Sequence, residues 1–333
     1  MSRARRDPRQ AKLRRDRIRR LKAVGREPEP PPPEEFPYPQ HPLASERSMR
    51  EIHALLEGQQ FDNIDQVNAR LQELTLGGRI SDIAGAWKRD DPKWRAQQLA
   101  YDALETDSLE EALRLCNEAV RLDPDCIDAQ RLMVSVAPMS PEKRLFLMRD
   151  VVARAERILG ERFFEENAGH FWGIIETRPY MRAKQHLGEL LAEAGDIEAA
   201  IAVFERMLEL NTNDNQGMRY PLLGLYLTVS RLEGVRDVMS RYQEEKVMGS
   251  FAWARVLERW LAGELDEAQA ALAQARKVNA FVEPYASGAR AIPQQTPEFY
   301  RPGDDSEAQV CACELAPAWR RHAGFRQWLR AQK

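Results

Sequence analysis

The sequence predicts an all-α protein whose paired helices stack into a right-handed helical solenoid. The first observation is the stretch AGDIEAAIAVFERMLEL, in which a Gly-Asp turn precedes apolar residues at helical spacing. The same arrangement returns in LAGELDEAQAALAQARKVN and, in a weaker form, in VSRLEGVRDVMSRY. The turn positions of the three copies are Gly195, Ser230 and Gly263, at intervals of 35 and 33 residues. This regular spacing indicates supersecondary units that stack on their neighbours.

A helix-turn-helix unit of about 34 residues is typical of the tetratricopeptide repeat. We therefore expect tetratricopeptide-like repeats over residues 93–280. The first clear unit runs from Lys93 to Cys126, with a capping box at Ser108, and residues 127–160 predict another helical pair. Ala112 and Ala200 occupy equivalent positions, but their separation of 88 residues exceeds two periods by about 20. The surplus predicts an insertion near residues 161–180, either an inserted helix or a repeat with a long connection.

The segments on either side of the repeats predict additional helices. Residues 45–92 contain two amphipathic patterns, and we expect a small N-terminal helical element there. Residues 281–333 begin with a proline-interrupted stretch that we expect to be extended. A helix then starts at Asp305 or Ser306, and a last helix starts at about Pro317. We expect these C-terminal helices to cap the stack, because the last unit of a solenoid needs a polar outer face.

The N-terminus differs sharply in charge from the rest of the chain. Residues 1–26 contain 12 Lys or Arg and two Asp, whereas the whole chain has a net charge of -3. The proline-rich sequence EPEPPPPEEFPYPQHP follows and favours an extended spacer, or a ligand of a proline-binding module. We expect residues 1–44 to be disordered. The basic residues within 3–26 predict contacts with nucleic-acid phosphates or an acidic protein, docking on the acidic remainder, or a solvated tail.

Composition indicates a soluble chain. Of its 333 residues, 43% are hydrophobic and 30% are charged, and no apolar run approaches the roughly 18 residues of a membrane span. The Arg-rich start lacks the apolar region of a secretory signal. Four scattered cysteines do not predict a disulfide framework. We therefore expect a cytoplasmic location.

The C-terminal half resembles a known group of proteins. The stretch from Phe171 to Leu223 carries the two motifs ETRPYMR (176–182) and NDNQGMR (213–219). In these motifs it is similar to the suppressor-of-tumorigenicity-seven family and to related bacterial tetratricopeptide proteins. The resemblance implies a repeat-built protein without catalytic residues. It does not carry over the membrane association of the eukaryotic members, because this chain lacks a spanning segment.

The same two motifs supply the candidate binding residues. In tetratricopeptide geometry the first helix of each unit lines the concave groove, and each motif lies at the start of such a helix. Planar Arg forks there would suit a carboxylate or a phosphate. The alternative is that the arginines pair with Glu176 or cap helix ends, and that the asparagines serve turns. The candidate binding residues are Arg178, Tyr180, Arg182, Asn213, Asn215, Arg219 and Tyr220.

No motif predicts catalysis, a cofactor or a metal. His170 lies beside Phe171 and Trp172, and we expect it to be packed among these aromatic residues. The spacing of Cys311 and Cys313 does not match a zinc site. Phosphate-binding loops, dinucleotide fingerprints and nucleophile elbows do not occur in the sequence. We therefore expect a protein that is not an enzyme and needs no cofactor.

Two functions follow from these observations. The first is a non-enzymatic scaffold that binds a peptide or a helix of another protein in the concave groove. The second is a nucleic-acid-associated adaptor, in which residues 3–26 contact phosphates and the repeats recruit a protein partner.

Overall fold

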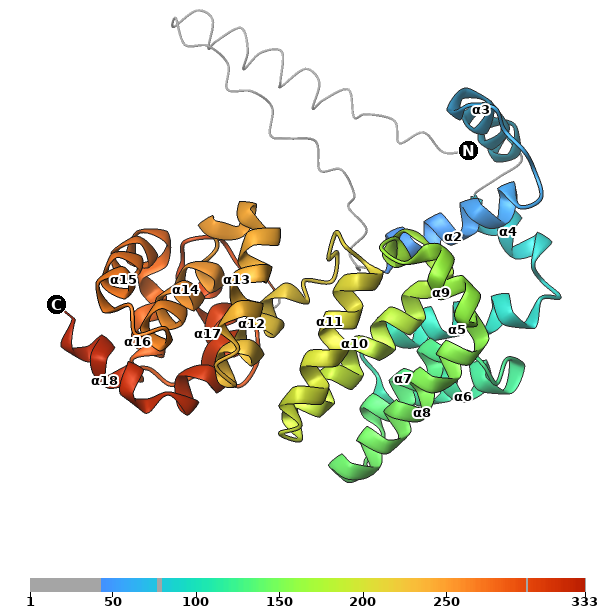
Figure 1. Ribbon diagram of the computed structural model, residues 1–333. Coiled ribbons are helices and arrows are strands. Elements are labelled where there is room, and N and C mark those ends of the chain that lie inside the picture. The colour runs from blue at the N-terminus through green and yellow to red at the C-terminus, as the bar shows by residue number, and fades with distance from the viewer. Residues whose placement is uncertain (1–42, 77–79, 298, 333) are drawn as a thin grey trace, which may run out of the picture. The chain divides into compact units, whose positions relative to one another are not determined.

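The computed structural model describes residues 43–76, 80–297 and 299–332 (Figure 1). Within these ranges the chain is helical and contains no β-strand, which confirms the all-α prediction. The basic tail and the proline-rich spacer, within residues 1–42, lie outside the described residues. The chain divides into residues 1–45 and residues 46–333, and the description below concerns the second unit.

The helices within residues 44–159 correspond to the predicted N-terminal element and to the first two predicted helical pairs. Three N-terminal helices are present where two were expected. The structure places these helices at α2 (Ala44–Leu56), α3 (Ile64–Thr75), α4 (Ile80–Trp87), α5 (Pro92–Glu105), α6 (Leu109–Leu122), α7 (Ile127–Val136) and α8 (Pro141–Leu159).

The predicted insertion near residues 161–180 is occupied by short elements before the next long helix. It contains α9 (Glu161–Asn167) and the 3-10 turns η1 (Phe171–Gly173) and η2 (Ile175–Thr177). The following helices are α10 (Arg178–Glu193), α11 (Ile197–Leu210), α12 (Arg219–Thr228), α13 (Leu232–Arg241), α14 (Gly249–Leu261) and α15 (Leu265–Asn279), with η3 (Gln243–Val247) between α13 and α14.

The three turns aligned in the sequence have the same conformation. Gly195, Ser230 and Gly263 all adopt positive φ, at 81°, 58° and 78°. In each turn the amide of this residue donates to the carbonyl three residues earlier, and the next amide donates to the carbonyl five residues before it. This is the Schellman pattern, which ends a helix in the left-handed region. The periodic sequence therefore corresponds to repeated local geometry.

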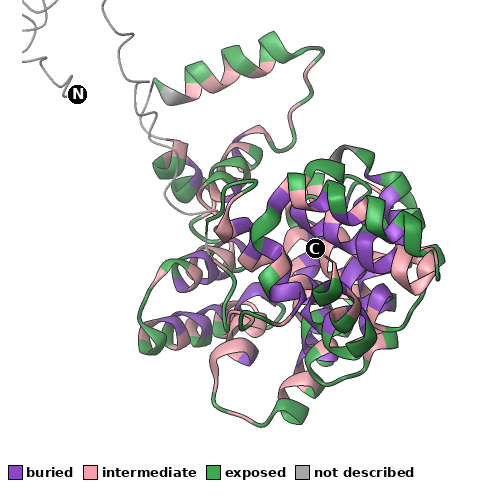
Figure 2. Cartoon of the chain, turned by 90° about the vertical axis from the view of Figure 1, so that its left-hand side faces the viewer, coloured by how far each residue is buried: buried purple, intermediate pink, exposed green. Residues whose placement is uncertain are grey.

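Helices adjacent in sequence pack against each other. The pairs α5–α6, α10–α11, α12–α13 and α14–α15 are in contact, and so are α5–α7, α7–α10 and α12–α14. Gly188 on α10 lets the ring of Phe204 on α11 approach closely, because a Cβ at position 188 would overlap that ring. The main apolar core contains buried residues from Ile127 to Leu329. These residues lie on the inward sides of the helices, coloured purple in Figure 2.

The C-terminal segment folds back onto earlier helices. It contains η4 (Ala280–Val282), α16 (Glu283–Ala286), α17 (Asp305–Arg321) and α18 (Ala323–Ala331). Helix α17 lies beside α12 and α14 (Figure 1). Its backbone comes so near α12 that a Cβ at Gly224 would overlap the carbonyl oxygen of Glu314. The side of α12 and α14 that meets α17 is therefore covered by the chain itself.

The boundary between the last two helices differs from the prediction. Pro317 does not start a helix but lies inside α17, and the break falls at His322. As a result Trp319 belongs to α17, while Phe325 lies on α18 and packs edge-on against Trp260 of α14 with ring centroids 5.7 Å apart. A proline removes one helical hydrogen bond without always ending the helix, because tertiary packing can hold the flanking turns.

Candidate functional site

A cavity of about 770 Å³ lies among the C-terminal part of α10, the turn before α12 and one face of α17. Residues from these elements share its walls with Met248 and Ser250 at the start of α14. Helices α10 and α17 contribute both carboxylates and apolar side chains, among them Ala192, Val310 and Pro317. The charged residues on the walls are Glu189, Glu193, Asp214, Arg219, Glu307 and Glu314.

Helix α10 contributes two carboxylates one turn apart. Glu189 and Glu193 are spaced i,i+4, so they lie on the same face of the helix. Glu189 accepts a hydrogen bond from Gln185 at 2.9 Å, and Glu193 has no partner among the described residues. Burial by the surrounding protein raises the pKa of Glu189, and the charge of Glu193 raises it further. The charge of Arg131 acts on the pKa of Glu189 in the opposite direction, but neither carboxylate forms an ion pair with a described residue.

Helix α17 contributes two further carboxylates with different roles. Glu307 is buried and accepts from the amides of Gly249 and Gly303, at 2.9 and 2.7 Å, and from the side chain of Asn279 at 2.8 Å. Because Gly249 begins α14, Glu307 stabilises a helix N-terminus and attaches α17 to it. Glu314 accepts from the hydroxyl of Ser250. Burial raises the pKa of Glu314 to about 7, with a further contribution from the charge of Glu307.

Arg219 is the one basic residue on the cavity wall in the part of the chain that the structure describes, and it is already paired. Its guanidinium contacts Asp214 at 3.0 Å and Glu245 at 3.0 Å. It also lies over the rings of Tyr220 and Tyr242, 4.9 and 5.1 Å from their centroids. The cavity therefore presents an excess of negative charge.

The arginines of the first motif are also held by the chain's own acids. Arg182 contacts Glu46 of α2 at 2.8 Å and Asp128 of α7 at 2.5 Å. Arg178 reaches the same Glu46 at 3.4 Å, and Tyr101 of α5 donates to it at 2.9 Å. Burial opposes ionisation of Asp128, but Arg182, with help from Arg131 and Gln97, outweighs burial, and the pKa of that carboxyl is lowered. We call Glu46, Asp128, Arg178 and Arg182 the buried ion cluster.

The seven predicted binding residues do not line one cavity. Asn215, Arg219 and Tyr220 line the large one, Arg182 lines a smaller one with His186, and Tyr180 lines a third beside α5. Asn213 is exposed at the turn. The expected open pair of Arg forks is absent, because carboxylates from α2, α7 and the turn before α12 occupy both arginines. The alternative prediction, that the arginines form ion pairs within the chain, therefore fits the structure better. Their partners, however, do not include Glu176.

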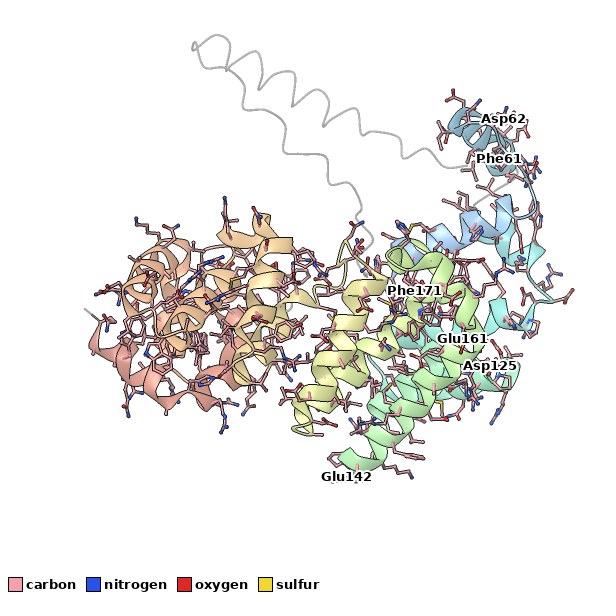
Figure 3. The ribbon with its side chains drawn as sticks, in the orientation of Figure 1. Phe61, Asp62, Asp125, Glu142, Glu161 and Phe171 are labelled. Atoms are coloured by element: carbon pink, nitrogen blue, oxygen red, sulfur yellow. The ribbon has the colours of Figure 1, made fainter. Side chains whose placement is uncertain are left out.

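The environment of His170 differs from the expectation. His170 is exposed, and its backbone forms an isolated bridge with Asn211. The neighbouring Phe171, which is labelled in Figure 3, is fully buried instead and packs against Phe163, Phe164 and Tyr180. The aromatic cluster thus excludes the imidazole, because Phe171 fills the interior position.

Sequence reasoning missed the acidic residues of the cavity. Glu189 and Glu193 on α10, and Glu307 and Glu314 at i,i+7 on α17, each lie on one helical face. That spacing was visible, but the association of the two helices was not. Asp214 was also missed; it adopts positive φ and accepts from the amides of Met218 and Arg219 at 2.7 and 2.9 Å, which caps α12.

Comparisons add no assignment for this site. The chain matches no protein-family model, and no curated protein matches it. No His, Cys, Asp and Glu side chains among the described residues cluster as metal ligands. In those same residues no helix has the length and apolar character needed to cross a membrane.

Proposed function

We propose that this chain is a non-enzymatic binding module built from tetratricopeptide-like repeats stacked as a right-handed solenoid. The repeated turn geometry at Gly195, Ser230 and Gly263 supports the repeats. Contacts of α5 with α7, of α7 with α10 and of α12 with α14 support the stacking. The resemblance of residues 171–223 to the suppressor-of-tumorigenicity-seven family agrees with a repeat protein that has no catalytic residues.

The cavity takes a basic segment of a partner protein. The observation that carries this proposal is the group formed by Glu189, Glu193 and Glu314, three carboxylates on one cavity that form no ion pair with a described residue. Arg131 and Arg219 act on Glu189 and Glu314 only through longer-range attraction. Like charges placed close together disfavour ionisation, and an entering guanidinium or ammonium group relieves that cost. Tyr300 on the same walls offers an aromatic face to a cation, whereas the ring of Tyr220 already lies under Arg219.

The ligand proposed here is a cation, whereas the sequence motifs predicted a carboxylate or a phosphate, and the ion pairs of the arginines are the reason for the difference. A carboxylate or phosphate would have to displace Asp214 and Glu245 from Arg219, or Glu46 and Asp128 from Arg182. Displacement would leave buried carboxylates unpaired, which costs several kcal/mol. A Lys or Arg side chain meets no such competitor on the α10 and α17 walls.

A fluorescent hexapeptide of alternating Lys and Arg tests the proposal by anisotropy titration with the full chain. Replacing Glu189, Glu193 and Glu314 by Gln should weaken binding about tenfold or more, because charge-assisted hydrogen bonds are lost. The control variant replaces the exposed residues Glu165, Glu233 and Glu267, which lie outside the cavity, and changes the net charge equally. We expect the control to bind within about twofold of the native chain. Equal losses in both variants would show non-specific attraction and exclude the cavity.

The second candidate function remains the nucleic-acid adaptor. It is favoured by the 12 Lys or Arg among residues 1–26, which lie outside the described residues. Labelled RNA and DNA should then bind at low salt and dissociate at higher salt. Removing residues 1–26 should abolish that binding and leave the hexapeptide affinity unchanged. Nucleic-acid binding that survives the deletion would contradict this candidate.

A further inference from the structure

A second cavity, of about 340 Å³, lies between residues 285–292 and the helices α17 and α18. It shares no lining residue with the acidic cavity. Arg290, Arg320 and Arg326 line it together with Trp319, and no carboxylate is among its described lining residues. The two cavities therefore have opposite charge.

Trp319 provides a buried donor in this cavity. Its side chain is only 2% exposed, and its indole Nε1 has no hydrogen-bond acceptor among the described residues. Buried indole N–H groups usually have a partner, because an unmade hydrogen bond costs free energy. Trp319 therefore carries an unused donor at the wall of the cavity.

Arg326 provides a second donor, held in place by the backbone. Its Nε atom is buried without an acceptor. Its guanidinium lies against Gly288, where any Cβ would overlap it, and Gly288 has a φ of +75°. Position 288 thus favours glycine for two reasons, the backbone conformation and the space that the guanidinium occupies.

The remaining arginines set the net charge of the cavity. Arg290 is neutralised by Asp305 and lies over the ring of Tyr285, 4.7 Å from its centroid. Arg320 is exposed and has no ion pair among the described residues. Trp319, Arg320 and Arg326 therefore present donors and positive charge without an acceptor of their own.

We infer that this cavity binds a phosphate monoester. Its free polar groups are donors, so the complementary ligand is an oxyanion, and a phosphoryl group offers three terminal oxygens to the three donor side chains. Arginine forks match phosphate geometry. The cavity also has room beyond one phosphoryl group, and Tyr285 and Ile292 supply an apolar wall for the organic part of the ester.

Indole ¹⁵N labelling of the full chain tests the inference. Phenyl phosphate is titrated while the indole N–H signals are followed, and a Trp319→Phe variant assigns the Trp319 signal. We expect that signal to move downfield and saturate, because its N–H gains an acceptor. Arg326→Gln should weaken the affinity about tenfold, and Arg320→Gln should weaken it less. A Trp319 signal that does not move at millimolar phenyl phosphate would overturn the inference.

Matched controls separate a built site from general attraction. Arg321→Gln removes the same charge from the neighbouring exposed position, which does not line the cavity, and should leave the affinity within about twofold. Losses from Arg321→Gln equal to those from Arg320→Gln would overturn the site. Benzoate should bind at least about tenfold more weakly than phenyl phosphate, and equal binding would overturn the phosphate assignment. Phenyl phosphate and a phosphotyrosine hexapeptide then distinguish a free ester from a phosphorylated side chain, according to which binds more tightly. Inorganic phosphate that binds as tightly as phenyl phosphate would overturn the assignment to a monoester.

Discussion

Arg182 binds two carboxylates that come from different helices and are both removed from water. The side chains of Glu46 and Asp128 are 4% and 0% exposed, and Arg182 forms hydrogen bonds to both oxygens of each. A bidentate guanidinium can satisfy several lone pairs at once, which lysine cannot do. The buried ion cluster therefore holds α2 and α7 against α10.

Replacing Arg182 by Gln should lower the free energy of unfolding by about 3–5 kcal/mol, because two buried carboxylates would lose their main cation. Urea denaturation followed by circular dichroism measures this change. The control is Arg206→Gln, which breaks an exposed i,i+3 pair with Glu209 and should cost less than about 1 kcal/mol. Comparable losses in the two variants would show that the cluster contributes no more than a surface pair.

Glu314 should make stability depend on pH near neutrality. Its pKa is raised from 4.5 to about 7 by burial and by Glu307, against the opposing effects of Ser250 and Arg219. The folded protein therefore binds this proton more tightly than the unfolded chain does. The contribution of this proton to the free energy of unfolding is fully present below pH 4.5 and is lost as the pH rises through about 7. The Glu314→Gln variant should not show this contribution.

Urea unfolding of the native chain and the Glu314→Gln variant, at intervals from pH 5 to pH 8, tests this expectation. The variant should gain stability relative to the native chain as the pH rises. The hexapeptide affinity of the native chain should rise over the same interval, because the carboxylate becomes charged. A stability difference that stays constant with pH would refute the raised pKa.

The turns that join paired helices illustrate how local chemistry fixes an element. Ser230 occupies the left-handed position that glycine occupies in the two equivalent turns, with φ at 58°. A side chain at such an angle meets the neighbouring carbonyl and costs roughly 1 kcal/mol. This turn is therefore the least favourable of the three in backbone conformation.

Replacing Ser230 by Gly should raise the free energy of unfolding by about 0.5–1 kcal/mol, since it relieves this strain. The reciprocal change Gly263→Ser should lower it by a similar amount, because a Cβ at position 263 meets open space and only the backbone angle matters. Thermal or urea unfolding measures both variants. The same sign of change in both would show that φ does not control these turns.

The four cysteines report on the cooperativity of the whole described chain. Burial raises the pKa of Cys116 to about 11 and that of Cys126 to about 12, and burial also raises the pKa of Cys311. Few thiolates form at pH 8, and thiolates are the reactive species. Cys313 is only half-buried and lines the acidic cavity.

We expect iodoacetamide at pH 8 to label Cys313 first, and to label the other three thiols only when the protein unfolds. Mass spectrometry after timed labelling counts the modified sites, and labelling in concentrated urea gives the unfolded reference. Labelling of Cys311 as fast as Cys313 would instead show that α17 detaches from α12 and α14 while the remainder stays folded.

The sequence was sufficient for features set by neighbouring residues. The turns at Gly195, Ser230 and Gly263 and the cap at Ser108, which accepts from Glu111 at 3.3 Å, follow from local chemistry. The partner of Arg182 could not be predicted, because Glu46 lies 136 residues away. Periodicity shows which face of a helix is apolar but not which helix covers it, so the packing of α17 on α12 was also missed. The acidic cavity depends on that packing.

The return of α17 also determines the order in which the chain can become fully packed during translation. Helix α14 ends at Leu261, and α17 begins 44 residues later at Asp305. At about 5–20 residues per second, the ribosome needs roughly 2–9 s to make that interval. Throughout this time the apolar sides of α12 and α14 lack their cover, so we expect nascent chains to recruit chaperones there until α17 emerges.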